Sequence, residues 1–262
     1  MVQTIEYKLR LQKMKKYHDY EFNLLGVDEV QNFTKSRLRF WYSHIKKNAL
    51  KKDGDIFEFG VYKGNSLIAA ALILKKMKSK KKIFGFDSFK GFPLYSKFDN
   101  LNNFYNSKYF SDTFIKKYEK FLNVKKLSSN IKKITPKTIA SSGEFNQTSY
   151  ESIKKKIDYF ELKNVELVKG SFEKTVPNFF NSKKISISSC NLDCDLYESY
   201  KVTLPYVFKN LTKGGYIHLD EYFSFKYPGA KIAIDEFCKK SNIKPKKQLV
   251  RYGEFERWFL TK

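Results

Sequence analysis

Short apolar runs alternate with longer amphipathic stretches along this chain. Apolar runs of about four to eight residues that end at a turn or an acid are typical of buried strands, whereas apolar residues at every third or fourth position are typical of helices. The pattern predicts strands over residues 55–59, 83–86, 165–168, 185–192, 216–219, 249–252 and 257–260. It predicts helices over residues 66–77, 112–122, 150–160, 198–208 and 229–239. This alternation indicates an α/β fold with a doubly wound, mostly parallel sheet that closes with antiparallel strands at the C-terminus.

Three segments between or before these elements also carry a signal. Residues 1–50 are polar and rich in lysine, with apolar residues at roughly helical spacing near their end, so we expect one or two N-terminal helices there. Residues 92–160 form a long connection, which we expect to act as a lid, because long connections often cover a functional site. Lys213–Gly215 is expected to be the turn that ends the preceding helix. Without an internal repeat or a linker, residues 1–262 are expected to form a single domain.

Composition narrows the class of protein. The 262 residues are 42% hydrophobic and 17% aromatic, which suits one sizeable core and not a disordered chain. No apolar run approaches the roughly 20 residues that a transmembrane helix needs, and the first residues lack the apolar core of a secretory signal. The three cysteines are an odd number and lack the spacing of a zinc site. We therefore expect a cytoplasmic protein with no membrane span and with reduced cysteines.

The formal net charge of +24 raises the question of a nucleic-acid partner. The positive charge comes mainly from lysines that are scattered along the whole chain, and lysine makes fewer bidentate phosphate contacts than arginine. We favour a general attraction for acidic small molecules over dedicated nucleic-acid binding.

Acidic residues follow the predicted strands, where open α/β sheets bind their ligands. The first loop has the pattern Glu-x-Gly-x-x-x-Gly, from Glu58 to Gly64, in which Gly60 and Gly64 permit a tight turn. A glutamate there would repel a pyrophosphate but suits a cationic group such as the ammonium of S-adenosylmethionine. Asp87, about 20 residues further on, lies where an acid accepts hydrogen bonds from a ribose. A plain strand–turn–helix bend is the alternative explanation of this loop.

Asp193 and the pair Asp220–Glu221 end two strands that we expect to be neighbours. Three carboxylates at adjacent strand ends repel one another unless a cation lies between them, and oxygen ligands suit Mg²⁺. The alternative is that these acids cap helices or pair with lysines. Asp195 is interpreted as a cap of the following helix, and His218 as a packed strand histidine more than a base.

Several of these segments occur in the order and at the spacings of a known family. They are Asp55–Gly64, Phe86–Pro93, Val165–Pro177, Leu192–Ser199, Gly214–Tyr222 and Ala230–Phe237. Together they resemble the macrocin O-methyltransferase (TylF/MycF-type) family, which methylates sugar hydroxyls, over roughly residues 50–240. The resemblance implies a Rossmann-like class I methyltransferase fold and an O-methyltransferase that depends on S-adenosylmethionine and Mg²⁺. It further implies a small-molecule acceptor that contains a sugar, and a homo-oligomer such as a dimer.

The resemblance also implies roles for individual residues. Cofactor binding is expected of Glu58, Gly60, Tyr62, Gly64, Asn65, Ser66, Asp87, Ser88, Gly170, Ser171 and Phe172. Asp193, Asp220 and Glu221 are expected to bind the metal, with Asp193 also the catalytic acceptor of the substrate proton. Glu221 departs from the family, which usually has a second aspartate there, and Cys194 replaces its usual glycine. The longer glutamate is expected to shift the metal or to bind it through water.

Two other functions are consistent with the same segments. A methyltransferase that acts on RNA or another nucleic acid would use the net positive charge, and its binding would depend steeply on salt. A protein that kept the fold without the activity would use residues 92–160 as a partner surface. The fold alone does not decide among them.

Overall fold

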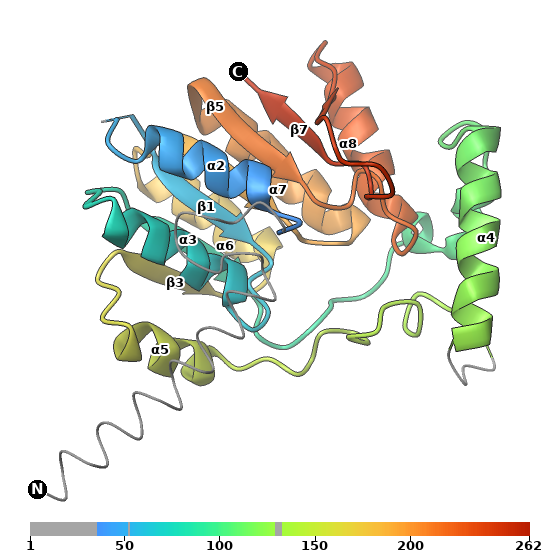
Figure 1. Cartoon of the computed structure of the whole chain (residues 1–262), viewed down its shortest axis with the longest axis horizontal. Helices are drawn as coiled ribbons and strands as arrows, with labels where there is room; N and C mark the ends of the chain where they lie inside the picture. Colours follow the sequence, from blue (N-terminus) through green and yellow to red (C-terminus); the bar gives the residue numbers. More distant parts are fainter. Residues whose placement is uncertain (1–35, 52, 129–132) are drawn as a thin grey trace, which may run out of the picture.

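The computed structural model describes residues 36–51, 53–128 and 133–262 of the chain. Its centre is a seven-stranded sheet in the order β3-β2-β1-β4-β5-β7-β6 (Figure 1). The strands are β1 Asp55–Phe59, β2 Ile83–Asp87, β3 Val165–Lys169, β4 Ile187–Leu192, β5 Leu211–Leu219, β6 Lys246–Lys247 and β7 Trp258–Thr261. The first five strands pair in parallel, and β7 pairs antiparallel with β5 and β6. The expected doubly wound α/β sheet with antiparallel C-terminal strands is confirmed.

Helices cover both faces of this sheet (Figure 1). On one face, α2 (Arg39–Asn48), α3 (Asn65–Lys76) and α5 (Tyr150–Tyr159) bury apolar side chains against Ile56 and Ile83. On the other face, α6 (Phe172–Ser182) packs on the phenylalanines of β1 and β2, and α7 (Tyr197–Asn210) and α8 (Pro228–Lys240) belong to the same apolar cluster. Burial on both faces explains why β1 and β2 are nearly continuous apolar runs.

Three details of the sheet differ from the sequence-based expectation. The strand expected to start at Ile185 starts at Ile187, and the one expected at Tyr216 already starts at Leu211. Lys213–Gly215 therefore lies within β5 and is not the turn that ends α7. The pairing of β4 with β5 shifts register at this point, and Gly214 has a φ of 75°, so the glycines form an irregularity within the strand.

One predicted strand near the C-terminus is not formed, and one helix, α6, was not predicted. The strand expected over Leu249–Tyr252 is not formed, and the two-residue strand β6 precedes it. Leu249 and Tyr252 are fully exposed, so their apolar character does not reflect burial in a sheet. Helix α6 was not expected, although Val176, Phe179 and Phe180 have helical spacing and are buried. Pro177 within this helix weakened the sequence pattern.

The long connection after β2 contains the short helices η1 (Lys97–Asp99) and η2 (Leu101–Tyr105) and the helix α4 (Asp112–Ser128). These elements form their own apolar cluster with the segment 223–227, which follows β5. Buried Asp99 anchors them, because its Oδ1 accepts a hydrogen bond of 2.9 Å from the Tyr197 N–H at the start of α7. The expected N-terminal helices lie outside the described residues, except for α2. Within the described ranges, no helix is long and apolar enough to cross a membrane.

Candidate active site

A cavity of about 700 Å³ lies at the carboxyl ends of the parallel strands. Loops that follow β1 to β5 line it, together with parts of the long connection and the segment after β5. Most of the expected site residues face this cavity: Gly60, Tyr62, Asn65, Ser66, Asp87, Ser88, Gly170, Ser171, Phe172, Asp193, Asp220 and Glu221. Glu58 and Gly64 are the two expected residues that do not line it. The chain thus brings widely separated segments to one place.

The first loop is shaped by contacts within the protein. Gly60 has a φ of 90°, and a Cβ atom there would lie 1.8 Å from the Asp193 carbonyl oxygen. Only glycine fits where the end of β1 passes this close to the end of β4. Gly64 also has a left-handed backbone and directly precedes α3.

Asp87 holds the first loop from the neighbouring strand. Its Oδ2 accepts hydrogen bonds of 2.8 Å from the N–H groups of Val61 and Tyr62, and its Oδ1 accepts one of 2.7 Å from the Phe89 N–H. The carboxylate therefore fixes the loop backbone at the edge of the cavity. This organising role was not expected from the sequence.

The first loop is also tied to the long connection at two carbonyl groups. The Thr148 hydroxyl donates a hydrogen bond to the Tyr62 carbonyl. The Lys156 ammonium donates one of 3.2 Å to the Lys63 carbonyl. The segment that carries the lid-like elements therefore returns to the core by way of the first loop.

Glu58 lies beneath the first loop and is completely buried. Its Oε1 accepts a hydrogen bond of 2.8 Å from the Asn191 amide of β4. Burial raises the pKa of the Glu58 carboxyl to about 8, although hydrogen bonds from Ser66 and Asn191 oppose the rise. Glu58 is therefore mostly protonated at neutral pH in the structure described, and it does not present the anion that its residue type suggested.

The acids at the ends of β4 and β5 gather on one side of the cavity. Carboxylate oxygens of Asp193, Asp195 and Glu221 all lie within 4.8 Å of one another. Glu221 Oε2 accepts hydrogen bonds from the Tyr200 hydroxyl at 2.5 Å and from the Asp195 N–H at 3.3 Å. Burial, and then repulsion by the neighbouring carboxylates, raises the pKa values of Asp195 and Glu221 well above the usual range. An oxygen-only group of this kind fits a hard divalent cation.

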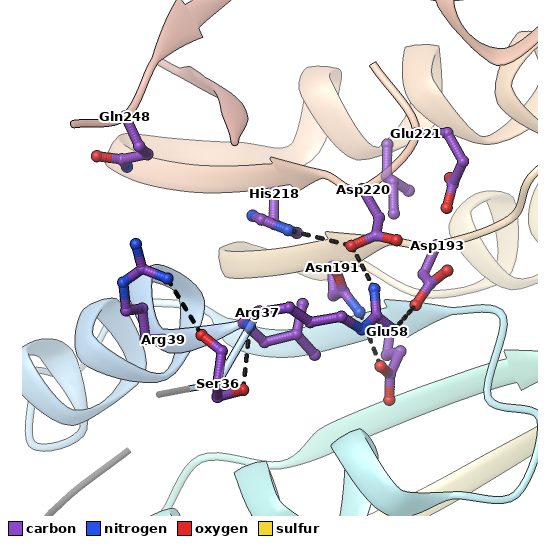
Figure 2. A network of polar contacts seen from close by, with 12 residues as sticks. Ser36, Arg37, Arg39, Glu58, Asn191, Asp193, His218, Asp220, Glu221 and Gln248 are labelled. Atoms are coloured by element: carbon purple, nitrogen blue, oxygen red, sulfur yellow. Dashed lines mark hydrogen bonds and ion pairs between the residues drawn. The ribbon is translucent and has the colours of Figure 1, made fainter. Parts of the chain in front are cut away.

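Asp220 stands apart from this group. Its Oδ1 pairs with the Arg37 guanidinium and lies 3.5 Å from Nε2 of buried His218 (Figure 2). Burial acts in the opposite direction, but the charge of Arg37 and the neighbouring His218 hold the pKa of Asp220 well below its usual range. The structure thus separates one of the three expected metal ligands from the other two.

Arg37 is the functional residue that the sequence reasoning missed. It precedes α2, and its guanidinium also donates a hydrogen bond of 2.6 Å to Asp193 Oδ2. Figure 2 shows it between Asp193 and Asp220. Nothing in the lysine-rich N-terminal segment distinguishes this arginine, because its partners lie more than 150 positions away and meet it only in the folded chain.

Asp195 was expected to cap the helix that follows. The residue before α7 is Leu196, and Asp195 has a φ of 59°. The first free N–H of this helix, that of Tyr197, is satisfied by Asp99 instead. Asp195 is therefore free to face the cavity, which it lines beside Asp193.

The other side of the cavity has a different character. Aromatic side chains of the long connection, of the loop after β5 and of the segment before β7 line it, together with three cationic residues. These residues are Phe92, Phe121, Phe145, Phe223, Phe225, Phe255, Lys90, Lys226 and Arg257. Aromatic faces and cations together suit a ligand with a ring and a negative charge. No local pattern in the sequence indicates that these residues line one wall of the cavity.

Comparisons with known proteins decide the family. A family model described as macrocin-O-methyltransferase (TylF) matches residues 125–253. Over these residues, which are just under half of its length, the chain is similar to the TylF family. The resemblance found in the sequence is confirmed, and the chain is an O-methyltransferase. The match begins near the end of α4 and ends before β7, so it includes α5, β3 to β6 and the carboxylates that follow β4 and β5.

Solved structures agree with the fold of this chain. The O-methyltransferase NovP is 20% identical with a TM-score of 0.57, over 86% of this chain and 77% of that one. The calicheamicin methyltransferase CalS11 is 22% identical with a TM-score of 0.59, over 86% and 76%. A second CalS11 structure, described as a TDP-rhamnose 3'-O-methyltransferase, is 21% identical with a TM-score of 0.50, over 86% and 80%. Among curated proteins, no match is found.

Proposed function

We propose that this enzyme transfers the methyl group of S-adenosylmethionine to a hydroxyl of a sugar-containing small molecule, with the help of Mg²⁺. The observation that carries the proposal is one cavity with two chemically different ends. The first loop, Asp87 and residues 170–172 form one end, and the carboxylate group and the aromatic wall form the other. A methyl donor and an acceptor would thus meet in one cavity.

The first end suits the donor. Gly60, Tyr62, Asn65 and Ser66 offer backbone and polar groups to the methionine part, and Asp87 with Ser88 lies where the ribose is held in Rossmann-like enzymes. Gly170, Ser171 and Phe172 would border the adenine. Gly64 shapes the turn into α3, and Glu58 lies beneath the loop, held by its hydrogen bond with Asn191 of β4.

The carboxylate group suits the metal. Mg²⁺ prefers oxygen ligands, and Asp193 and Glu221 are common to the set expected from the sequence and the set that the structure brings together. When bound, Mg²⁺ would make the acceptor hydroxyl more acidic. Asp193 lines the cavity and would accept the proton of that hydroxyl.

The transfer itself is an in-line displacement. The acceptor oxygen attacks the methyl carbon, an O–C bond forms, and the C–S bond breaks to release S-adenosylhomocysteine. The proton of the hydroxyl passes to Asp193. The residues of the chain contribute alignment, because the fixed first loop and the aromatic wall hold donor and acceptor at opposite ends of the cavity.

The acceptor is proposed to be an acidic sugar derivative, such as a nucleotide-linked sugar. Phe223, Phe225 and Phe255 offer faces for a ring, and Lys90 and Lys226 offer positive charge to a phosphate. The description of CalS11 as a TDP-rhamnose 3'-O-methyltransferase supports this class. We further propose a cytoplasmic homo-oligomer, and size-exclusion chromatography with light scattering would test the assembly.

Calorimetry with S-adenosylhomocysteine and a radiolabelled methyl-transfer assay over a panel of nucleotide sugars test the proposal. We expect micromolar binding and transfer to at least one nucleotide sugar. Asp193→Asn should lower turnover by about 100-fold or more while leaving S-adenosylhomocysteine affinity within about threefold. Glu166→Gln, which alters a solvent-exposed ion pair with Lys82, is the matched control. Absence of S-adenosylhomocysteine binding would contradict the proposal, and full activity of Asp193→Asn in EDTA would contradict the metal.

A further inference from the structure

The outer face of α4 is basic and partly apolar. Its inner face is buried, because Phe114 and Tyr118 pack in the apolar cluster of the long connection. On the opposite face, Lys116, Lys120 and Leu127 follow one another at helical spacing, and all three side chains are exposed. Leu127 keeps 89% of its surface open to solvent. Figure 1 shows α4 at the margin of the molecule, away from the central strands.

A tight turn before β7 carries a second exposed apolar group. The Glu254 N–H donates a hydrogen bond of 3.1 Å to the Arg251 carbonyl, and Glu254 Oε2 accepts one of 2.9 Å from the Arg251 N–H. Tyr252 is fully exposed at the tip of this turn, and Leu249, just before the turn, is exposed as well. Arg39 of α2 pairs with Glu254 and fixes the turn to the core. A defined backbone therefore holds both side chains out in water.

Aromatic contacts place this turn and α4 side by side. The ring of Phe255, directly after the turn, lies 5.8 Å from that of Phe225, which lies 5.4 Å from the ring of Phe121 on α4. Val124 follows Phe121 by one helical turn and is exposed. Both Phe121 and Phe255 line the cavity. The outer face of α4 and residues 249–254 therefore form one rim beside the aromatic side of the cavity.

The rim carries an excess of positive charge. Residues 112–137 contain eight lysines and two acids. Residues 246–257 contain two lysines, two arginines and two glutamates, and both glutamates already pair with a basic residue of the chain. The excess charge lies beside the exposed apolar side chains, so it attracts an anionic surface to them.

Charge and apolar exposure together define the chemistry of the partner. A second copy of the chain would bring the same basic face against itself in a two-fold interface, and the two faces would repel each other. A nucleic acid would match the lysines but offers no apolar region for Leu127 and Leu249. An anionic bilayer offers both, because its headgroups attract lysines and its interface accommodates tyrosine rings and apolar side chains.

We propose that the rim binds the surface of an anionic lipid bilayer, with the lysines of α4 at the headgroups and Leu127, Leu249 and Tyr252 inserted between them. The contact lies at the membrane surface and needs no membrane-spanning segment. It places the aromatic side of the cavity next to the bilayer. The docking does not depend on methyl transfer, so either proposal can fail while the other stands.

Flotation of the purified full-length protein with lipid vesicles tests the role of charge. At about 150 mM salt, phosphatidylcholine vesicles with about 30% phosphatidylglycerol should bind the protein at least tenfold more strongly than phosphatidylcholine alone. Lys116→Glu combined with Lys120→Glu should weaken this binding at least tenfold. Lys76→Glu combined with Lys80→Glu changes two exposed lysines near the amino end of β2 and should cost less than threefold. Equal losses in the two pairs would overturn the proposal, because net charge would then act without a docking face.

Insertion of the turn is tested separately. Tyr252→Ser combined with Leu249→Ser should weaken vesicle binding at least fivefold, whereas Leu50→Ser should leave it unchanged. Leu50 is the matched control because it is 69% exposed but follows α2, outside the rim. In the Tyr252→Trp variant, lipids brominated in their acyl chains should quench the new fluorescence, and in Leu50→Trp they should not. Vesicle binding without this difference in quenching would overturn the proposed docking of the turn.

Two further results would assign the rim to another partner and overturn the proposal. The first is nanomolar RNA binding that the Lys116→Glu and Lys120→Glu pair abolishes, in a protein that does not float with vesicles. The second is a dimer in light scattering that Tyr252→Ser with Leu249→Ser dissociates, again without vesicle binding. Thermal unfolding followed by circular dichroism shows that each variant is folded, so a loss of binding reports on the rim itself.

Discussion

Glu58 is the penultimate residue of β1 and lies beneath the first loop, where no part of its side chain reaches solvent. An exposed glutamate is ionised at neutral pH, but burial lifts the pKa of this carboxyl from 4.5 to about 8. Its residue type and position in the motif could be identified from the sequence. Its charge could not, because it depends on the packing of β1 against β4.

The raised pKa of Glu58 makes the stability of the protein depend on pH. Between pH 4.5 and about 8 the folded state holds a proton that the unfolded state has released, so this group's contribution to the free energy of unfolding falls as pH rises. The fall is at most about 1.4 kcal/mol per pH unit. Urea unfolding of wild type and Glu58→Gln from pH 5 to 8 should show the wild type losing stability relative to the variant. Parallel curves would refute the shift, and Glu166→Gln provides the control.

Gly60 gives a second prediction at this scale. Gly60→Ala would place a Cβ atom 1.8 Å from the Asp193 carbonyl oxygen, and we expect it to lower the free energy of unfolding by about 3 kcal/mol. Gly253→Ala is the matched control, because its φ of 80° is similar but no atom of the described residues lies within 4 Å of its Cβ position. The control should lose only about 1 kcal/mol from backbone strain. Equal losses in urea unfolding would show that the close approach to β4 is unimportant.

At the scale of elements, the parallel strands were the easiest to predict. Buried runs such as Asp55–Phe59 and Ile83–Asp87 end at acids or glycines, and the local pattern sufficed. The irregular part of β5 and the exposed segment 249–252 were misjudged because strand pairing depends on partners distant in sequence. Arg37 was not predicted for the same reason, because its carboxylate partners are distant in sequence and come close to it only when α2 packs beside β4 and β5.

The long connection is held to the core by an element-scale contact that can be tested. Asp99 Oδ1 accepts the Tyr197 N–H of α7, and its Oδ2 accepts from Ser96, so Asp99→Ala should lower the free energy of unfolding by about 1–3 kcal/mol. Hydrogen exchange should show faster exchange in η1, η2 and α4. Asp112→Ala, at the exposed start of α4, is the control and should leave η1 and η2 protected. Unchanged exchange in Asp99→Ala would mean that the apolar cluster alone anchors the connection.

At the scale of the whole molecule, the net charge of +24 favours an acidic partner, which for the cavity is either a small ligand or a nucleic acid. Five of its positive residues, Arg37, Lys63, Lys90, Lys226 and Arg257, line the cavity, which suits a small acidic ligand. We therefore expect binding of a short RNA at 150 mM salt to be no tighter than about 1 μM, in the range of non-specific binding. Fluorescence anisotropy at several salt concentrations measures this. Nanomolar binding that persists at that salt would favour a nucleic-acid substrate.

The hydrogen bonds from Thr148 and Lys156 to the carbonyls of Tyr62 and Lys63 connect the first loop, at one end of the cavity, with the long connection, which lines the other end. Whichever substrate enters first stiffens the loop that the other must use. The second substrate then binds to a loop that is already ordered, so each substrate should bind more tightly when the other is present. Steady-state kinetics should accordingly reveal a preferred sequence of addition, and Thr148→Val should abolish the synergy before it abolishes either binding event.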